Sequence, residues 1–362
     1  MSEVLYRKYR PQRFDEVVGQ KHVLAVLTAA IIKNRISHAY LFSGPRGTGK
    51  TTVARIFARA INCQSKKLEA RPCNDCDICR EFVSGATLDL IEIDAASSRG
   101  IDEIRALKEA VEMLPFRSKY KVYIIDEVHM LTKEAFNALL KTLEEPPLHI
   151  VFILATTEID KVPETIISRV QHFEFRRIPE EDLVGALAEI CKKEKLRAEP
   201  EALGIIAALA EGSLRDAQSV LDQALAFSEG EIKSKDVRLL LGVPGSELLE
   251  KLILALISND TKSGIQTVQK SILGGTDIKA FFKMLIRNFR FMLYLKVVPE
   301  HEKELEKIIS KKELAFLKEN SDKTETNKIE QTLSALNESY DLLKAAYLPQ
   351  LALELAVLKI TN

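Results

Sequence analysis

Between a short apolar run and a helical pattern, the chain reads Gly44-Pro45-Arg46-Gly47-Thr48-Gly49-Lys50-Thr51. This matches the phosphate-binding P-loop, whose glycines let backbone N–H groups turn toward a phosphate at the N-terminus of a helix. In that pattern Lys50 reaches the β- and γ-phosphates, and the Thr51 hydroxyl is a ligand of Mg²⁺. A Gly-rich turn without a ligand is a poor alternative, given the flanking strand and helix. Residues 44–51 therefore predict a site for a nucleotide and Mg²⁺.

The surrounding half of the chain alternates strand-like and helical segments, which is typical of a parallel sheet flanked by helices. The apolar run 121–125 does not alternate with polar residues, as expected of a strand that is buried on both faces. We therefore expect an α/β domain over residues 1–178. The expected strands are 39–43, 88–93, 121–125, 150–155 and 171–175, and the expected helices are 50–62, 101–113 and 133–143.

Strand signals stop after Ile178-Pro179, and helical periodicity continues to the end of the chain. Gly242-Val243-Pro244-Gly245 interrupts this helical part. We therefore expect a small helical domain over 179–242 and an all-helical domain over 243–362, with residues 320–327 as a polar connector. The expected helices are 181–193, 200–211, 214–228, 248–257, 278–298 and 328–348.

An acidic pair, Asp126-Glu127, follows the apolar run at the position where open α/β sheets bind their ligands. Asp126 would help to hold the Mg²⁺, and Glu127 would orient and deprotonate an attacking water. The strand 150–155 ends in Thr156-Thr157, and either hydroxyl could sense the γ-phosphate; Thr157 is our candidate. An acidic pair that merely opens a loop is the alternative, and the upstream P-loop makes it the weaker one.

Four of the five cysteines lie close together, and Cys191 stands alone. Zinc binds four thiolates tetrahedrally, and a structural site of this kind can order a small loop-rich insertion. An iron–sulfur cluster is the rival, because Cys-x2-Cys-x2-Cys overlaps ferredoxin spacing, but the fourth Cys lies upstream and no Cys-Pro follows. We predict a structural Zn²⁺ site with the ligands Cys63, Cys73, Cys76 and Cys79, and a core position for Cys191.

The composition limits how the chain can reach its partners. Lys plus Arg equals Asp plus Glu at 52 each, so any contact with DNA must be local. The 46% hydrophobic and 29% charged composition is typical of a globular protein. The first residues contain no apolar export signal, and no later run is long enough to span a bilayer. We expect a cytoplasmic protein without a membrane partner.

Several motifs stand together in chain order: Tyr9-Arg10-Pro11, Val18-Gly19-Gln20, the P-loop, Asp126-Glu127-Val128-His129-Met130-Leu131, Leu143-Glu144-Glu145-Pro146-Pro147 and Ser168-Arg169. This combination closely resembles the AAA+ clamp-loader ATPases, and among them the bacterial DNA polymerase III gamma/tau type. The resemblance covers the nucleotide domain, the helical lid and, more weakly, the C-terminal helices. It implies an AAA+ core, a lid and a collar domain for oligomerisation, and it also implies zinc at the four cysteines.

The resemblance also assigns roles to individual residues. Arg169 would be an arginine finger that enters the ATP site of the adjacent subunit, and Val170 replaces the Cys that usually follows it. Gly212-Ser213-Leu214-Arg215-Asp216 resembles the second sensor, with Arg215 closing onto the phosphates. Residues before the P-loop would pack around the adenine: Tyr9, Arg10 and Val18.

The function implied is that of an ATP-hydrolysing motor subunit that opens a sliding clamp and loads it onto primed DNA for DNA polymerase III. The implied partners are loader subunits of the delta and delta-prime type, copies of the same chain, the clamp and primer-template DNA. Arg99 and Arg105 are candidates for DNA phosphate contacts, with a solvated helix face as an equal alternative. A branch-migration helicase would share the P-loop but has no reason to carry four clustered cysteines. A non-hydrolysing loader subunit would have a degenerate P-loop.

Overall fold

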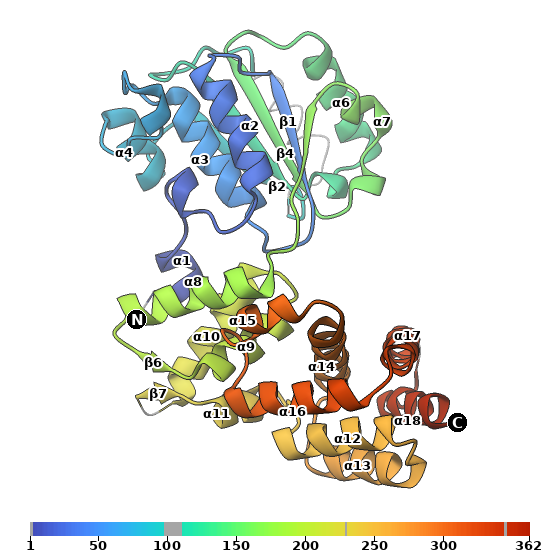
Figure 1. Ribbon diagram of the computed structural model, residues 1–362. Helices are drawn as coiled ribbons and strands as arrows, with labels where there is room; N and C mark the ends of the chain where they lie inside the picture. Colours follow the sequence, from blue (N-terminus) through green and yellow to red (C-terminus); the bar gives the residue numbers. More distant parts are fainter. Residues whose placement is uncertain (1–2, 98–110, 229, 344–345) are drawn as a thin grey trace. The chain divides into compact units, whose positions relative to one another are not determined.

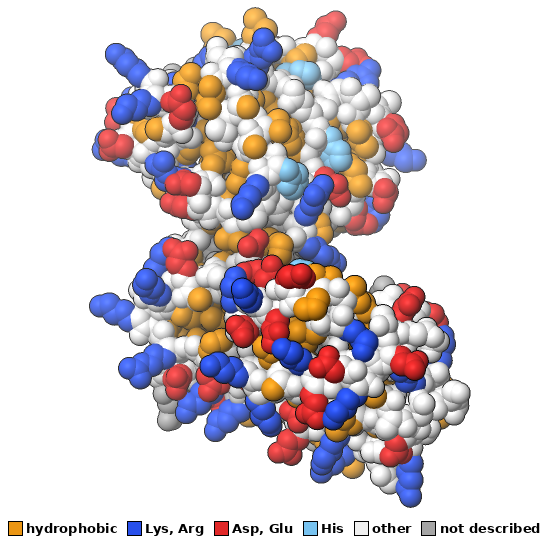
Figure 2. Space-filling model, viewed as in Figure 1, with side chains coloured by type: hydrophobic (Ala, Val, Ile, Leu, Met, Phe, Trp, Pro, Cys, Tyr) orange, Lys and Arg blue, Asp and Glu red, His pale blue; other side chains and the backbone are white. Residues whose placement is uncertain are grey.

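The computed structural model describes residues 3–97, 111–228, 230–343 and 346–362. It divides into two compact units, which are described separately (Figure 1). The first unit contains residues 6–178 and 213–215, and the second contains residues 3–5, 179–212 and 216–362. Among the described residues, no helix has the length and apolar character needed to cross a membrane. On the face drawn in Figure 2, acidic and basic side chains are interspersed in both units, in keeping with a formal net charge of 0.

A parallel sheet with the strand order β2-β3-β4-β1-β5 forms the centre of the first unit. All five predicted strands are confirmed, with ends that differ by at most two residues. This order brings the carboxyl ends of β1, β3 and β4 side by side, because β4 pairs with both of the others. The strands are β1 Ala39–Ser43, β2 Leu90–Asp94, β3 Lys121–Asp126, β4 Ile150–Thr156 and β5 Gln171–Glu174.

Helices cover both faces of this sheet, as alternating strand residues require. Val122 and Ile124 of β3 pack in a core with α2 (Lys21–Ile32) and α3 (Lys50–Asn62). Tyr123 and Ile125 face the opposite core. That second core contains α6 and α7, which lie on the other side of the sheet in Figure 1. The remaining elements of this half are α1 Leu5–Lys8, η1 Phe14–Glu16, η2 Leu68–Ala70, α4 Asp77–Ser84, η3 Val128–Met130, α6 Lys133–Glu144, η4 Ile159–Lys161 and α7 Glu164–Ile167.

The helix predictions for this unit are largely confirmed. The helix predicted over 50–62 agrees to the residue, and the one predicted over 133–143 ends at Glu144. Most of the helix predicted over 101–113 lies outside the described residues, and so do Arg99 and Arg105.

The second unit is helical with one small exception. β6 (Arg197–Ala198) and β7 (Glu231–Ile232) form a two-residue parallel pair, so the prediction that strands end after residue 179 is wrong. Runs this short give no detectable periodicity. The helices are α8 Glu180–Lys193, α9 Pro200–Leu209, α10 Leu214–Phe227, α11 Ser234–Leu240, α12 Ser246–Ile257, α13 Thr261–Leu273, α14 Ile278–Val297, η5 Pro299–His301, α15 Glu302–Leu305, α16 Lys311–Lys323, α17 Thr326–Leu342 and α18 Pro349–Thr361.

Two predictions near the C-terminus are also wrong. The helix predicted over 328–348 ends at Leu342, and Pro349 begins a new one, since a proline fits the first turn of a helix but not its interior. In the predicted connector 320–327, only Thr324 and Glu325 lie outside helices, and they separate α16 from α17. Asn320 and Ser321 are polar yet buried, because their side chains donate to the carbonyl oxygens of Phe316 and Met292. The predicted domain boundaries at residues 178 and 242 stay predictions.

Candidate functional site

The P-loop connects β1 to α3 and is packed tightly against its neighbours. Gly44, Gly47 and Gly49 all have positive φ angles, of 135°, 75° and 103°. A Cβ atom on Gly44 would lie 2.1 Å from the carbonyl oxygen of Phe175, and one on Gly47 would lie 1.9 Å from Oγ of Ser213. Gly44 and Gly47 therefore require glycine for both backbone conformation and space, and Gly49 requires it for backbone conformation alone.

Lys50 is buried inside the loop. Its Nζ donates to the carbonyl oxygens of Gly44 and Pro45, at 2.7 and 2.9 Å. Burial lowers the pKa of Lys50, and the nearby carboxylates of Glu127 and Asp126 oppose that change. Neutral carbonyl oxygens thus hold the ammonium group at the loop. A charged phosphate oxygen would bind it more strongly than they do.

The two predicted Mg²⁺ ligands lie together. Oγ1 of Thr51, in the first turn of α3, donates to Oδ2 of Asp126 at the end of β3, at 2.7 Å. The other carboxylate oxygen, Oδ1, accepts the backbone N–H of Glu127 at 3.0 Å. Hydroxyl and carboxylate oxygens are ligands that Mg²⁺ accepts beside phosphates, so this pair fits the metal.

Glu127 contacts the end of β4 through Thr157. The backbone of Glu127 is left-handed, with φ of 49°. Its Oε2 accepts the backbone N–H and the Oγ1–H of Thr157, at 3.2 and 3.0 Å. Thr156 is fully buried, and its Oγ1 lies 3.0 Å from Nδ1 of His129. Of the two threonines, Thr157 is therefore the one that contacts the acidic pair.

The N-terminal motifs border the same loop. Gln20 is buried; its Nε2 donates to the carbonyl oxygens of Arg176 at 2.7 Å and Thr48 at 3.4 Å. Arg10 and Pro11 line a cavity of about 400 Å³ together with Thr52, the residue that follows the P-loop. Tyr9 and Val18 are half-buried, and their adenine contacts stay predictions.

The start of α10 is tied to the P-loop. The backbone N–H of Leu214 donates to the carbonyl oxygen of Gly47 at 3.1 Å. The guanidinium of Arg215 lies over the Tyr6 ring, with Cζ 5.0 Å from its centroid. Arg215 thus follows a residue that is hydrogen-bonded to the loop, and its role as a second sensor stays a prediction.

Arg169 lies on the surface just after α7. Its side chain is 35% exposed, and Nη2 lies 2.9 Å from Oε1 of Glu144. Nη1 donates to the carbonyl oxygen of Thr165 at 2.8 Å. A residue that serves a neighbouring subunit must be reachable from outside, and Arg169 meets that requirement.

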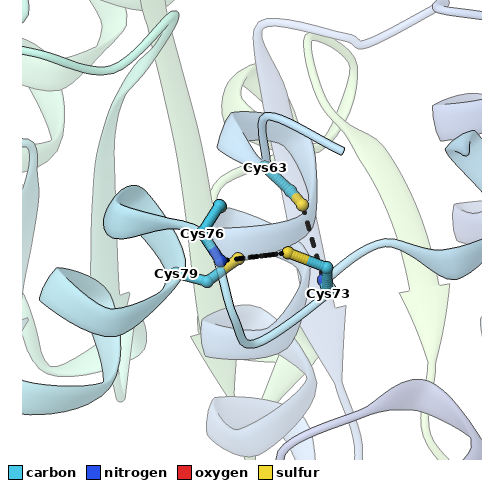
Figure 3. A group of neighbouring side chains, drawn as sticks. All are labelled: Cys63, Cys73, Cys76 and Cys79. Atoms are coloured by element: carbon cyan, nitrogen blue, oxygen red, sulfur yellow. Dashed lines mark hydrogen bonds between the residues drawn. The ribbon is translucent and has the colours of Figure 1, made fainter. Parts of the chain in front are cut away.

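The four cysteines form one cluster beside α3 and α4. Their Sγ atoms all lie within 4.8 Å of one another (Figure 3). Tetrahedral Zn–S bonds of about 2.3 Å separate the sulfur atoms by about 3.8 Å. Sγ of Cys73 lies 4.0 Å from Sγ of Cys79, so the cluster needs little adjustment to fit this geometry.

Backbone N–H groups surround these sulfur atoms. Sγ of Cys63 accepts from the backbone N–H groups of Ser65 and Cys73, at 3.5 and 3.4 Å. Burial raises the pKa of Cys63 and Cys79. Burial also raises the pKa of Cys73, but backbone hydrogen bonds from Cys76 and Asp75, together with side-chain hydrogen bonds to Cys63 and Cys76, outweigh it and lower the value to about 6. A bound cation would favour the thiolate form of all four side chains.

Sequence reasoning overlooked two residues. Gln20 and His129 both lie within motifs that were recognised, yet neither was given a role. Their positions inside those motifs are the one sequence signal that could have pointed to them, because both side chains contact residues far away in the sequence.

Three family models match the chain in sequence order. These are the DNA polymerase III delta subunit over residues 19–179, the DNA polymerase III clamp loader subunit ATPase lid domain over 182–230, and domain III of DNA polymerase III subunits gamma and tau over 232–362. Together they cover most of both units.

Similar proteins carry the same names. DNA polymerase III subunit tau of Bacillus subtilis is 45% identical over 358 residues, which cover 99% of this chain and 63% of that protein. DNA polymerase III subunit gamma of Buchnera aphidicola subsp. Acyrthosiphon pisum is 37% identical over 363 residues and 99% of both chains. Among solved structures, the Thermotoga maritima RuvB Holliday junction branch migration motor has a TM-score of 0.48 and 21% identity, over 69% of this chain and 79% of that one. The chain thus spans less than two thirds of the tau relative.

Proposed function

The chain belongs to the DNA polymerase III gamma/tau family, and from this we propose that it hydrolyses ATP as a motor subunit of a bacterial clamp loader. The observation that carries the proposal is the contact chain at the carboxyl edge of the sheet. It runs from Thr51 to Asp126 and from Glu127 to Thr157, beside a P-loop with its lysine in place. A nucleotide-binding subunit without hydrolysis would not need this arrangement.

Each part of the site has a task in hydrolysis. The P-loop backbone and Lys50 would hold the β- and γ-phosphates, and Thr51 and Asp126 would hold Mg²⁺, which neutralises phosphate charge when bound. Glu127 would orient the attacking water and take its proton. Thr157 would keep the Glu127 carboxylate facing the γ-phosphate. Arg215 would report the phosphate state to the lid.

An adjacent subunit of the loader would supply the last group that hydrolysis needs. Arg169 would stabilise the charge that develops in the ATP site of an adjacent subunit. We propose an AAA+ domain over residues 1–178, a lid over 179–242 and a collar over 243–362. The proposed partners are subunits of the delta and delta-prime type, further copies of this chain, the sliding clamp and the backbone of primed DNA, in the cytoplasm.

We propose that the cysteine cluster holds a structural Zn²⁺. Four thiolates fill its tetrahedral shell, and a site filled in this way leaves no open position for catalysis. The spacing of the sulfur atoms and the N–H groups that face them support this assignment over a set of free thiols.

Replacing Cys79 with Ser should weaken zinc binding by more than about 100-fold, because even partners outside the ligand shell are worth 10–100-fold. Cys79 is fully buried, so no water replaces its sulfur easily. Metal analysis of the purified protein would show about one zinc per wild-type chain and almost none for Cys79→Ser. Cys191→Ser, at a buried cysteine outside the cluster, is the control and should keep its zinc. Equal metal content in all three proteins would refute the zinc assignment.

Steady-state ATP hydrolysis tests the function as a whole. The chain would be assayed alone, then with its loader subunits, and then with clamp and primed DNA. We expect low turnover for the chain alone and a sharp rise only in the complete mixture, because an arginine of the adjacent subunit completes the proposed site. Turnover that ignores clamp and primer would point to a different motor and reject the loader assignment.

A further inference from the structure

His129 is a buried residue of the site without a role in the mechanism above. It lies in η3, two residues after Glu127, and its side chain is only 5% exposed. Three polar atoms surround the ring. Nδ1 lies 3.0 Å from Oγ1 of Thr156 and 3.4 Å from Oε2 of Glu127, and Nε2 lies 3.2 Å from Oε1 of Glu158.

The hydrogen bonds around the ring define where its proton lies. An ionised carboxylate only accepts, and a hydrogen bond from Lys161 lowers the pKa of Glu158, so Nε2 must carry the hydrogen that faces Glu158. Oγ1 of Thr156 already accepts the backbone N–H of Glu158 at 3.0 Å. This hydroxyl keeps a second lone pair and its own hydrogen, so Nδ1 can either donate to it or accept from it. The Glu127 carboxylate, 3.4 Å from the same nitrogen, only accepts when it is ionised. The contacts therefore assign a hydrogen to Nε2, and they leave Nδ1 paired in either form.

These contacts join two segments that must be aligned for hydrolysis. Glu127 sits in a left-handed turn after β3, outside the sheet hydrogen bonds that fix the strand itself. Both hydrogen-bond donors to its Oε2 come from Thr157, on the segment after β4. The direction of the Glu127 carboxylate therefore depends on how the turn lies against residues 156–158. His129 is the side chain that spans this gap, through Thr156 and Glu158.

We propose that His129 is a positioning residue for ATP hydrolysis that holds the turn of Glu127 against the sensor segment 156–158. The inference rests on the proposed function, since it assigns His129 a part in the same reaction. The ring contacts Thr156, Glu158 and Glu127, and it would act on the reaction through the Glu127 carboxylate. Its loss should therefore lower kcat and leave nucleotide affinity unchanged, because the P-loop and Lys50 bind the phosphates without it.

Four substitutions test which property of His129 matters. His129→Ala removes the ring, and His129→Phe keeps an aromatic ring of similar shape without polar atoms. His129→Asn places an amide at the position of Nδ1, within reach of Thr156, whereas His129→Gln places it nearer the position of Nε2. Each protein would be assayed in the complete loader with clamp and primed DNA, together with the affinity for a fluorescent ATP analogue.

We expect kcat to fall about 10- to 100-fold for the Ala and Phe variants, which is the effect of misplacing a reacting group by about 1 Å. The Asn variant should recover most of this loss, and the Gln variant should recover little. Nucleotide affinity should stay within about twofold in all four. Wild-type kcat in the Phe variant would show that the ring only fills space, and a loss of affinity equal to the loss of kcat would show general damage. Either result overturns the proposal.

A measurement without ATP or partner subunits separates this inference from the proposed function. Nitrogen-15 NMR of the histidine-labelled chain, with the His129 signal assigned from the Asn variant, reports the state of both ring nitrogens. We expect a protonated Nε2 that donates to Glu158. An unprotonated Nε2 would overturn the contact scheme even if the loader hydrolyses ATP. Absent turnover in the wild-type loader would reject the function and leave the NMR result standing.

Discussion

Replacing Arg169 with Ala should lower partner-dependent ATP turnover by about 10³- to 10⁵-fold, the range that an arginine finger contributes to phosphoryl transfer. The guanidinium lies at the surface of the first unit, 35% exposed, with its own-chain contacts on α6 and α7. Removing it deletes charge from the neighbouring site and leaves the P-loop of its own chain intact. ATP binding should therefore survive. Steady-state turnover of the complete loader and the affinity for a fluorescent ATP analogue would measure the two effects.

Mixing two inactive proteins shows whether Arg169 acts across a subunit boundary. Lys50→Ala impairs the phosphate site but keeps the arginine, and Arg169→Ala does the reverse. If adjacent copies share a site, loaders assembled from both proteins should regain part of the turnover that neither shows alone. Arg80→Ala, at an exposed arginine on α4, is the control and should behave as wild type. A mixture with no recovery would contradict a role in the adjacent copy, and full activity of Arg169→Ala would contradict any role.

The strands and the P-loop helix could be predicted because their physical requirements are written in local sequence. A central parallel strand must be apolar on both faces, and Val122 to Ile125 shows this as an unbroken run. The helix after the P-loop starts at Lys50 because the motif itself includes a strand, a turn and a helix N-terminus. Local signals fail where packing decides. Asn320 and Ser321 look like connector residues, but the helix backbone satisfies their side chains.

The site shows the same division between local and long-range information. The sequence places Thr156 and Thr157 together and cannot tell which faces the acidic pair. The structure distinguishes them: Thr156 is fully buried and contacts His129, and Thr157 contacts Glu127 directly. The role we assign to His129 depends on residues 27 and 29 positions later in the chain, and no spacing rule connects them.

Replacing Glu127 with Gln should lower turnover by about 10²- to 10⁴-fold, the usual contribution of a general base, and leave ATP bound. The amide keeps the length of the side chain, and its oxygen can still accept from Thr157, so the site should keep its shape. What is lost is the ability to take a proton from water. Single-turnover hydrolysis in the complete loader would measure the loss, and a fluorescent ATP analogue would measure the retained affinity.

The matched control is Glu145→Gln, which changes the same group in an exposed residue after α6. It should hydrolyse ATP at the wild-type rate. If Glu127→Gln also hydrolyses ATP at that rate, Glu127 is not the base, and water activation must be sought elsewhere in the site. If instead the Glu127→Gln protein no longer binds ATP, the carboxylate serves nucleotide binding, and its hydrogen bonds to Thr157 shape the site before hydrolysis begins. The contacts between β3 and β4 lead us to expect that Thr157 holds Glu127 in place until water and γ-phosphate are in line. Only a variant that keeps its affinity for ATP and loses turnover agrees with this role.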